Sequence, residues 1–201
     1  GDDVARVALR ALAVAVATLV PTTIAGWIVE AATERCSPET GVAFMIVCAG
    51  GNAVFGVAIG VAGAMMSVRR GRIFAAIALV LGAFLAMSLH RLYHEPQIFV
   101  FDHAFGYWPG SLYDEEVTVG SALLAFRAYT VFLALSIVLV TRLFADPARV
   151  VLSFVSLRFG RVVALVLVCA ATLAMGRTGE DLGFDLDRRT IQNELSRKEL
   201  T

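Results

Sequence analysis

Four side chains that can bind a metal ion or move a proton lie close together in the middle of the chain. His90 and His94 are four residues apart, so on one helix they share a face, and Asp102-His103 follows after Pro96. Two histidines and a carboxylate can bind zinc or another transition metal. We keep these four residues as metal-site candidates. The alternative is that the histidines hydrogen-bond carbonyl groups or lipid at the membrane boundary.

The rest of the chain offers little further catalytic chemistry. The metal-site candidates match no standard signature, and the sequence has no His-Glu-x-x-His, no Ser-His-Asp order and no phosphate-binding glycine loop. Asp114, Glu115 and Glu116 precede an apolar run, where acidic side chains stabilise the positive end of a helix dipole. We therefore expect no catalytic residue and no cofactor within residues 1–201.

The composition predicts a membrane protein. Hydrophobic residues make up 58% of the 201 residues, charged residues 17%, and the mean hydropathy is +0.76. A bilayer core of roughly 30 Å needs about 20 apolar residues per helix, whereas the strands of a membrane barrel are about 10 residues long and alternate in polarity. The sequence predicts an all-α bundle with five spans, at Val7–Ile28, Gly41–Val68, Ile73–Leu89, Val119–Val140 and Arg161–Met175.

The charges between the predicted spans alternate in sign. One set of connections carries nine arginines and three aspartates, and the opposite set carries two arginines and eight acidic residues. Because cytoplasmic loops collect Arg and Lys, we expect the N-terminus inside and the C-terminus outside. This topology and anionic lipid explain the basic rim, so we expect no nucleic-acid partner. Sixteen of the seventeen bases are arginine, which is typical of a GC-rich bacterial genome and favours a bacterial inner membrane.

Three residues of the second span predict how it packs. Gly56 and Gly60 lie on one face, and small residues at this spacing let helix backbones approach closely. We expect this contact inside the chain, with self-association of two chains as the alternative. Asn52 is expected to hydrogen-bond a neighbouring helix, because an unpaired amide in hydrocarbon is costly.

Arg127 lies inside the fourth predicted span. An arginine in the middle of a bilayer costs about 2.5–3.5 kcal/mol, so its side chain should face the bundle interior and find an acceptor. Glu30 and the acidic triplet at 114–116 are the candidate partners. Extension of the side chain to the outer surface and a ligand or ion site are the alternatives.

The connection at 90–118 is unusually aromatic for a solvated loop. It holds all three histidines and seven of the nineteen aromatic residues. We expect it to fold back over the outer membrane boundary, with a short extended segment at Ile98–Phe101 and a turn at Pro109-Gly110. Its candidate interaction residues are Tyr107, Trp108, Tyr113, Asp114 and Glu115.

Two domains follow from this reading. Residues 1–175 form the helix bundle with its aromatic outer loop. Residues 176–201 form a polar extracytoplasmic tail, which we expect to dock on a partner or to begin a further domain, with a frayed end as the alternative. Between the last two spans, apolar residues from Val150 to Leu157 fall on one side of a segment flanked by arginines. That pattern predicts a short helix on the inner membrane surface.

One segment resembles a known group of proteins. Phe105–Glu115, Phe-Gly-Tyr-Trp-Pro-Gly-Ser-Leu-Tyr-Asp-Glu, is similar to a segment between two spans of poorly characterised bacterial multi-span membrane proteins, and Leu182–Phe184 with Arg189–Leu195 resembles a later stretch of them. Some members continue into an extracytoplasmic peptidase-like zinc domain, whose catalytic residues have no counterpart within residues 1–201. The resemblance implies a membrane anchor that presents something outside.

Three functions remain open. The first is a non-catalytic inner-membrane subunit or anchor, with the lipid bilayer and a membrane protein or a second copy as partners. The second is a transporter or channel component for a small anionic solute, with Arg127 and Asn52 along its path. The third is a membrane enzyme with a metal site in the loop at 90–116. A coupled transporter usually has a carboxylate inside a span and many contain inverted repeats; neither is present, so we favour the first.

Overall fold

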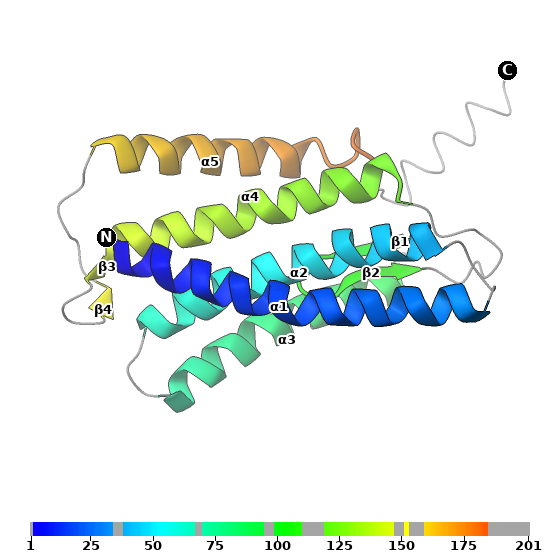
Figure 1. Cartoon of the computed structure of the whole chain (residues 1–201). Coiled ribbons are helices and arrows are strands. Elements are labelled where there is room, and N and C mark those ends of the chain that lie inside the picture. Colours follow the sequence, from blue (N-terminus) through cyan, green and yellow to red (C-terminus); the bar gives the residue numbers. More distant parts are fainter. Residues whose placement is uncertain are drawn as a thin grey trace, which may run out of the picture.

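The computed structural model describes residues 2–33, 38–66, 70–94, 99–109, 119–146, 151–152 and 159–184. Five helices contain most of these residues (Figure 1): α1 (Asp2–Thr33), α2 (Pro38–Met66), α3 (Arg70–His94), α4 (Ser121–Phe144) and α5 (Phe159–Arg177). Each predicted span overlaps one of these helices, and the ends of span and helix differ by two to five residues. The expected helical bundle is therefore confirmed.

Four of the helices are long and apolar enough to cross a membrane: α1, α2, α3 and α4. Helices are the form that such runs must take in lipid, because a helix bonds its own N–H and C=O groups. α5 has 19 residues and is a shorter apolar helix. At 1.5 Å per residue it extends over about 28 Å, close to the thickness of a bilayer core. The chain is a multi-pass helical membrane protein.

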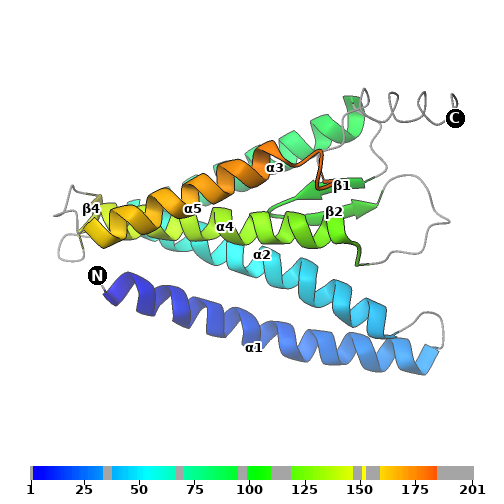
Figure 2. The ribbon, with the colours of Figure 1, turned by 90° about the horizontal axis from the view of Figure 1, so that it is seen from above.

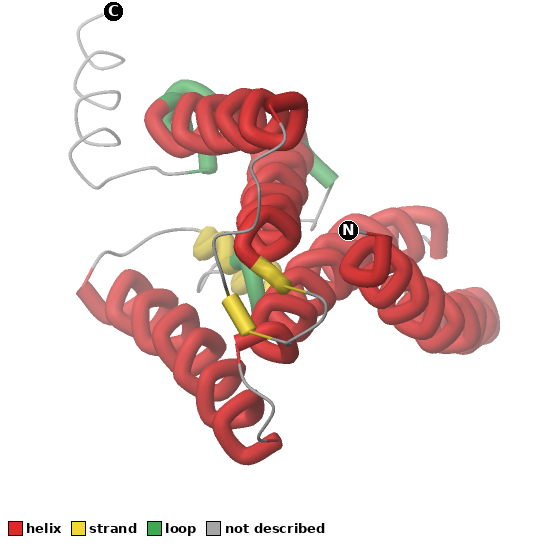
Figure 3. The backbone as a smooth tube through the Cα atoms, turned by 90° about the vertical axis from the view of Figure 1, so that its left-hand side faces the viewer, coloured by secondary structure: helices red, strands yellow, loops and turns green. Residues whose placement is uncertain are grey.

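α2 is the central helix of the bundle. It contacts α1, α3 and α4, while α5 packs against α4. Viewed along the bundle, α5 lies at the top and α3 at the bottom, with the short strands between them (Figure 3). The main core consists of buried residues of α2 and α4, with side chains of α3 packed against it: Phe55, Ala58, Ile59 and Ala134, then Ile77 and Phe84.

A β-hairpin enters the bundle between α3 and α4. β1 (Phe99–Asp102) pairs with antiparallel β2 (Gly106–Pro109), and the three residues between them form the turn (Figure 2). Gly106 has a φ of 98°, which suits the left-handed position that closes a three-residue hairpin. β1 contacts α3 and β2 contacts α2.

This hairpin corrects the expectation that the aromatic loop lies over the membrane boundary. The extended segment predicted at Ile98–Phe101 corresponds to β1, but the chain turns at 103–105, and Pro109 ends β2. The hairpin turn contacts α4 at Phe126 and Thr130, five and nine residues from the start of the helix, so it lies about 8–14 Å along the helix axis. Such non-helical backbone at membrane depth is tolerated where protein surrounds it. Gly110 lies outside the described residues.

A second difference lies between α4 and α5. β3 (Ala145–Asp146) pairs with β4 (Val151–Leu152), so part of the predicted surface helix is a two-residue ladder. α5 then runs back beside α4 (Figure 1). Ser136 and Thr172 form a hydrogen bond of 3.1 Å between these two helices. The start of α1 and the end of α5 consequently lie at opposite ends of the bundle. We call them the arginine end, where α1 begins, and the hairpin end, where α5 ends.

A tight turn follows α5 at the hairpin end. The amide of Phe184 donates to the carbonyl of Gly179 at 3.0 Å, and Gly183 has a φ of 79°. The turn directs Phe184 back onto α4, where its ring stacks on Tyr129 with centroids 5.8 Å apart and contacts Phe126 edge-on at 5.5 Å. Phe184 is buried. A packed aromatic side chain thus fixes the position of the chain just after α5.

Candidate functional site

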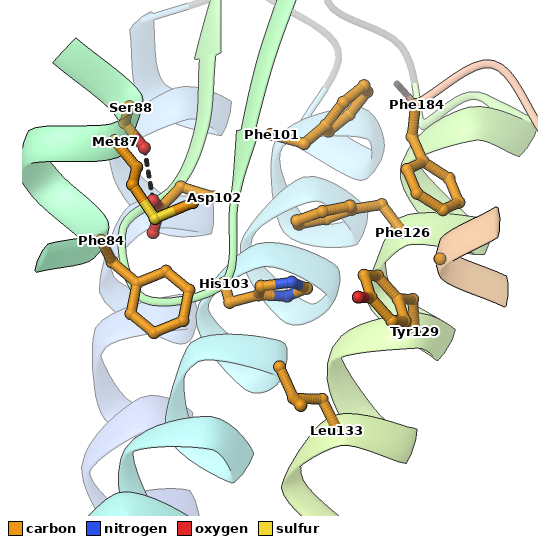
Figure 4. Close-up of a pocket in the computed structure, with 11 residues that line it drawn as sticks. Phe84, Met87, Ser88, Phe101, Asp102, His103, Phe126, Tyr129, Leu133 and Phe184 are labelled. Carbon is orange, nitrogen blue, oxygen red and sulfur yellow. Dashed lines mark hydrogen bonds between the residues drawn. The ribbon is translucent and has the colours of Figure 1, made fainter. Parts of the chain in front are cut away.

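Asp102 holds the hairpin turn in shape and ties it to α3. One carboxylate oxygen accepts the backbone N–H groups of Ala104 and Phe105 at 2.7 and 2.8 Å. Aspartate commonly closes a turn in this way. The other oxygen accepts the hydroxyl proton of Ser88 on α3 (Figure 4). Asp102 is only 4% exposed, so its carboxylate is a buried group with three hydrogen bonds from the protein.

His103 ties the same turn to α4. Its Nδ1 lies 2.8 Å from the hydroxyl of Thr130, and that hydroxyl lies 2.9 Å from the carbonyl of Phe126. Because a threonine has one hydroxyl proton and donates it to the carbonyl, His103 Nδ1 must carry the proton of the other bond. In the neutral imidazole, Nε2 then carries a lone pair. The hydrogen-bond chain therefore selects one tautomer of His103.

Aromatic rings surround the His103 ring (Figure 4). Phe126 stacks on it with centroids 4.6 Å apart, and Tyr129 meets it edge-on at 4.9 Å. Phe55 and Phe84 lie at 5.7 and 5.8 Å. The imidazole is thus buried in an aromatic environment contributed by α2, α3 and α4.

Arg127 lies on the other side of the hairpin, between α2 and α4. It is 5% exposed, and its Nη1 donates to the side-chain oxygen of Asn52 at 3.0 Å, with a longer contact of 3.5 Å to the Asp102 carbonyl. Its Nε and Nη2 have no hydrogen-bond partner among the described residues. Of the predicted partners, the side chain of Glu30 and the triplet at 114–116 lie outside the described part of the chain.

Two glycines make room for the Arg127 side chain. A Cβ atom at Gly51 would lie 2.7 Å from Arg127 Cδ, and one at Gly106 would lie 3.0 Å from Nη2. A buried arginine side chain can extend fully only where its neighbours leave space for it. Gly51 on α2 is therefore a positioning residue for the buried charge, and the sequence reading did not identify it.

A cavity of about 290 Å³ lies against the hairpin turn. Its wall comes from α3, β1, the turn, α4, the end of α5 and Phe184 (Figure 4). The polar side chains in the wall are Ser88, Asp102, His103 and Tyr129, and the other rings are Phe84, Phe101, Phe126 and Phe184. Arg127 and Asn52 do not line this cavity.

The structure does not bring His90 to Asp102 and His103. His90 is exposed on α3, and the side chain of His94 at the end of that helix lies outside the description. Within the described ranges, no three His, Cys, Asp or Glu side chains lie together in a way that could hold a metal ion. The structure therefore brings together two of the four candidates.

The predicted packing glycines lie on an open part of α2. No described atom comes within 4 Å of a Cβ placed at Gly56 or Gly60. The close approaches of this helix are at Gly51, against Arg127, and at Gly63, against Ile77 at 3.4 Å. Of the loop candidates, Tyr107 and Trp108 lie in β2, and their side chains are outside the description. Tyr113, Asp114 and Glu115 belong to residues 110–118, which the structure does not describe.

Ser88, Asp102 and His103 include the residue types of a hydrolytic triad but not its connections. In a triad the histidine bonds the serine and the acid orients the histidine. Here the serine bonds the acid, and the histidine bonds Thr130. The sequence reading did not single out Ser88, Thr130 or Tyr129, because one hydroxyl in an apolar helix carries no spacing signal. The described cavity wall therefore contains a serine, an aspartate and a histidine in which the serine is not bonded to the histidine.

The fold and the cavity together define a multi-pass helical membrane protein with a hairpin inserted among its helices. No protein-family model, curated protein or solved structure matches this chain. The resemblance of its two short segments to bacterial multi-span proteins stays a prediction. In the structure, Gly106 of the first segment lies beside Arg127, and Phe184 of the second packs on Phe126, so both segments meet neighbouring residues of α4.

Proposed function

We propose that this chain is a non-catalytic subunit or anchor of a bacterial inner membrane that presents the segment after residue 184 outside the cell membrane. The observation that carries the proposal is the packing of Phe184 on Phe126 and Tyr129. A C-terminal segment without a fixed position relative to α5 would need no such contact. A segment whose starting point is held in place can be presented to a partner in a defined position.

The distribution of charge supports the sidedness of this proposal. Arg6, Arg10, Arg70, Arg72 and Arg142 all belong to the arginine end of the described helices. Because cytoplasmic segments collect arginine, the arginine end belongs inside and the hairpin end outside. α5 then returns the chain to the outer side, which makes it the fifth span.

The hydrogen bonds at the hairpin turn support a structural role for its polar residues. Ser88, Asp102, His103 and Thr130 are all bonded within the protein. Buried polar groups that satisfy one another hold a particular arrangement of elements in place. This is what an anchor needs from its interior, and it requires no substrate.

One observation favours an anion path instead. Arg127 is buried with two nitrogen atoms that have no described hydrogen-bond partner, and an intramembrane charge is often functional. Against this, Arg127 and Asn52 bond each other and lie away from the cavity. We therefore place the anchor first and the anion path second.

The anchor can be tested by co-purification from the native membrane. We expect the tagged chain, cross-linked in membranes and purified in mild detergent, to carry one partner protein in a fixed ratio. Phe184→Ala should lower that ratio severalfold, whereas the matched control Leu182→Ala, at a 37% exposed position of the same turn, should keep it. The proposal is wrong if the chain purifies alone and conducts a small anion in vesicles, with the flux lost in Arg127→Met.

A further inference from the structure

The polar atoms in the cavity wall mostly accept hydrogen bonds. Ser88 donates its proton to Asp102, and His103 donates its Nδ1 proton to Thr130. What Ser88 and Asp102 present beyond those bonds is hydroxyl and carboxylate lone pairs. Of the polar side chains described in the wall, only Tyr129 has a hydroxyl proton that is not used in these bonds. Among the described residues, no lysine or arginine lines the cavity.

The wall also holds a buried carboxyl group that forms no ion pair with any described residue. Asp102 is 4% exposed, and none of the described residues forms an ion pair with it. Arg127 reaches the carbonyl of Asp102 rather than its carboxylate. A buried charge is costly unless an opposite charge compensates it. A cation bound in the cavity would supply that compensation.

The aromatic rings of the wall suit an organic cation. Phe84, Phe101, Phe126, Tyr129 and Phe184 all line the cavity. The faces of aromatic rings attract cations, and cages of such rings bind ammonium groups. A bare metal ion would instead require several oxygen, nitrogen or sulfur ligands. The combination of rings and one carboxylate points to ammonium chemistry.

We propose that this cavity binds an organic ammonium group, with Asp102 as its counter-ion and the surrounding rings as its cage. At about 290 Å³, and with about 30 Å³ per water molecule in the liquid, the space suits a group as large as ethanolamine or choline. This site shares Phe184 with the anchor proposal, but the proposed binding does not require the anchor function, because Asp102 and the other rings belong to the interior of the bundle.

The ammonium has two possible sources with the same chemistry, a free amine and a lipid headgroup. Met87 lines the cavity and is 57% exposed on α3, within the part of that helix apolar enough to span a membrane. One wall of the cavity therefore reaches the side of the bundle that faces lipid. A headgroup could enter there as readily as an amine could enter from water.

The first experiment measures binding of choline and ethanolamine to the full chain in a detergent without amine groups, by calorimetry. The uncharged analogue 3,3-dimethylbutanol, in which carbon replaces the nitrogen of choline, serves as the control ligand. We expect choline to bind at least about tenfold more tightly than this analogue, since cation–π and carboxylate interactions need the charge. Equal binding of the two, or tighter binding of inorganic phosphate, would overturn the proposal.

Two variants locate the site. Asp102→Asn keeps an acceptor for the turn amides but removes the charge, and we expect it to abolish the preference for choline over its analogue. Asp181→Asn, a change at an exposed carboxylate after α5, should leave that preference intact. Met87→Trp should fill the cavity from its exposed wall without touching the polar groups, and weaken choline binding at least about tenfold. Unchanged choline binding in Met87→Trp would place the ligand elsewhere, even where Asp102→Asn failed to fold.

The source of the ammonium is tested in nanodiscs of phosphatidylglycerol, with and without phosphatidylethanolamine. Retention of phosphatidylethanolamine by the wild-type chain in native mass spectrometry, lost in Met87→Trp, would support the headgroup. Choline or ethanolamine binding of equal strength in both kinds of disc would support the free amine. If neither lipid nor amine is retained, the proposal is wrong.

Discussion

Arg127 depends on a neighbour that has no side chain. Gly51 faces it from α2, and a methyl group there would lie 2.7 Å from Cδ and 3.3 Å from Nε. Gly51→Ala should therefore displace the arginine and lower the free energy of unfolding by about 1–3 kcal/mol. Gly50→Ala is the matched control, because nothing lies within 4 Å of that position. Thermal unfolding in mild detergent measures both changes.

For Gly50→Ala we expect no loss, since alanine in a helix is favoured over glycine by about 0.5–1 kcal/mol. Equal effects of the two substitutions would show that Arg127 can move aside without cost. In that case the close contact at Gly51 would contribute nothing to the position of the buried charge.

The bond between Asn52 and Arg127 can be tested by a double-mutant cycle. Asn52→Leu removes the acceptor 3.0 Å from Nη1 and leaves a buried charge, which should cost about 1–3 kcal/mol. Arg127→Met combined with Asn52→Leu removes the charge as well, so the double variant should be more stable than Asn52→Leu alone. Unfolding measurements on all four chains give the coupling. Strictly additive effects would mean that the two side chains do not stabilise one another.

Among the elements, the helices could be predicted from the sequence and the hairpin could not. An apolar run of about 20 residues has one stable form in lipid, so α1 to α4 follow from composition alone. The hairpin depends on Ser88 and Thr130, which are 14 and 27 residues away from their partners. No local spacing shows such a pair. The aromatic content of the loop indicated that it avoids water, but not that it enters the bundle.

The site could be predicted only in part for the same reason. Asp102 and His103 were recognisable from their side-chain types as candidates for binding a metal ion or moving a proton. The structure places both in the wall of one cavity. Their neighbours Phe84, Tyr129 and Phe184 come from three separate elements, and only the tertiary packing brings them together. His90 shares a helix with Ser88, yet it does not line this cavity.

Asp102 should determine whether the hairpin stays inserted. Asp102→Ala removes the acceptor for two turn amides and for the Ser88 hydroxyl. We expect hydrogen exchange at the amides of 104 and 105 to become about tenfold faster or more, the change produced by roughly 1.4 kcal/mol. Asp102→Asn keeps an oxygen for the amides and should give a smaller change. If Asp102→Ala exchanges as slowly as wild type, the turn is held by other contacts.

At the scale of the whole molecule, α5 decides the topology. The four longer helices would return the chain to the side where it began, and α5 reverses that result if it crosses. Its bond to α4 through Ser136 and Thr172, and its direction along α4 (Figure 1), support a crossing. Because Phe184 then contacts α4 near the hairpin, the cavity and the start of the tail would face the same compartment. The anchor proposal requires that arrangement.

This topology can be measured with alkaline phosphatase, which is active only outside the inner membrane. We expect fusions behind Thr33 and behind Phe184 to be active, and fusions ahead of Asp2 and behind Met66 to be inactive. The fusions at Thr33 and Met66 are the controls, since they flank α2, a helix of sufficient length to span. Because α5 separates Asp146 from Phe184, a fusion behind Asp146 should also be inactive. Equal activity behind Asp146 and Phe184 would mean that α5 lies along one surface, and the tail would then be in the cytoplasm.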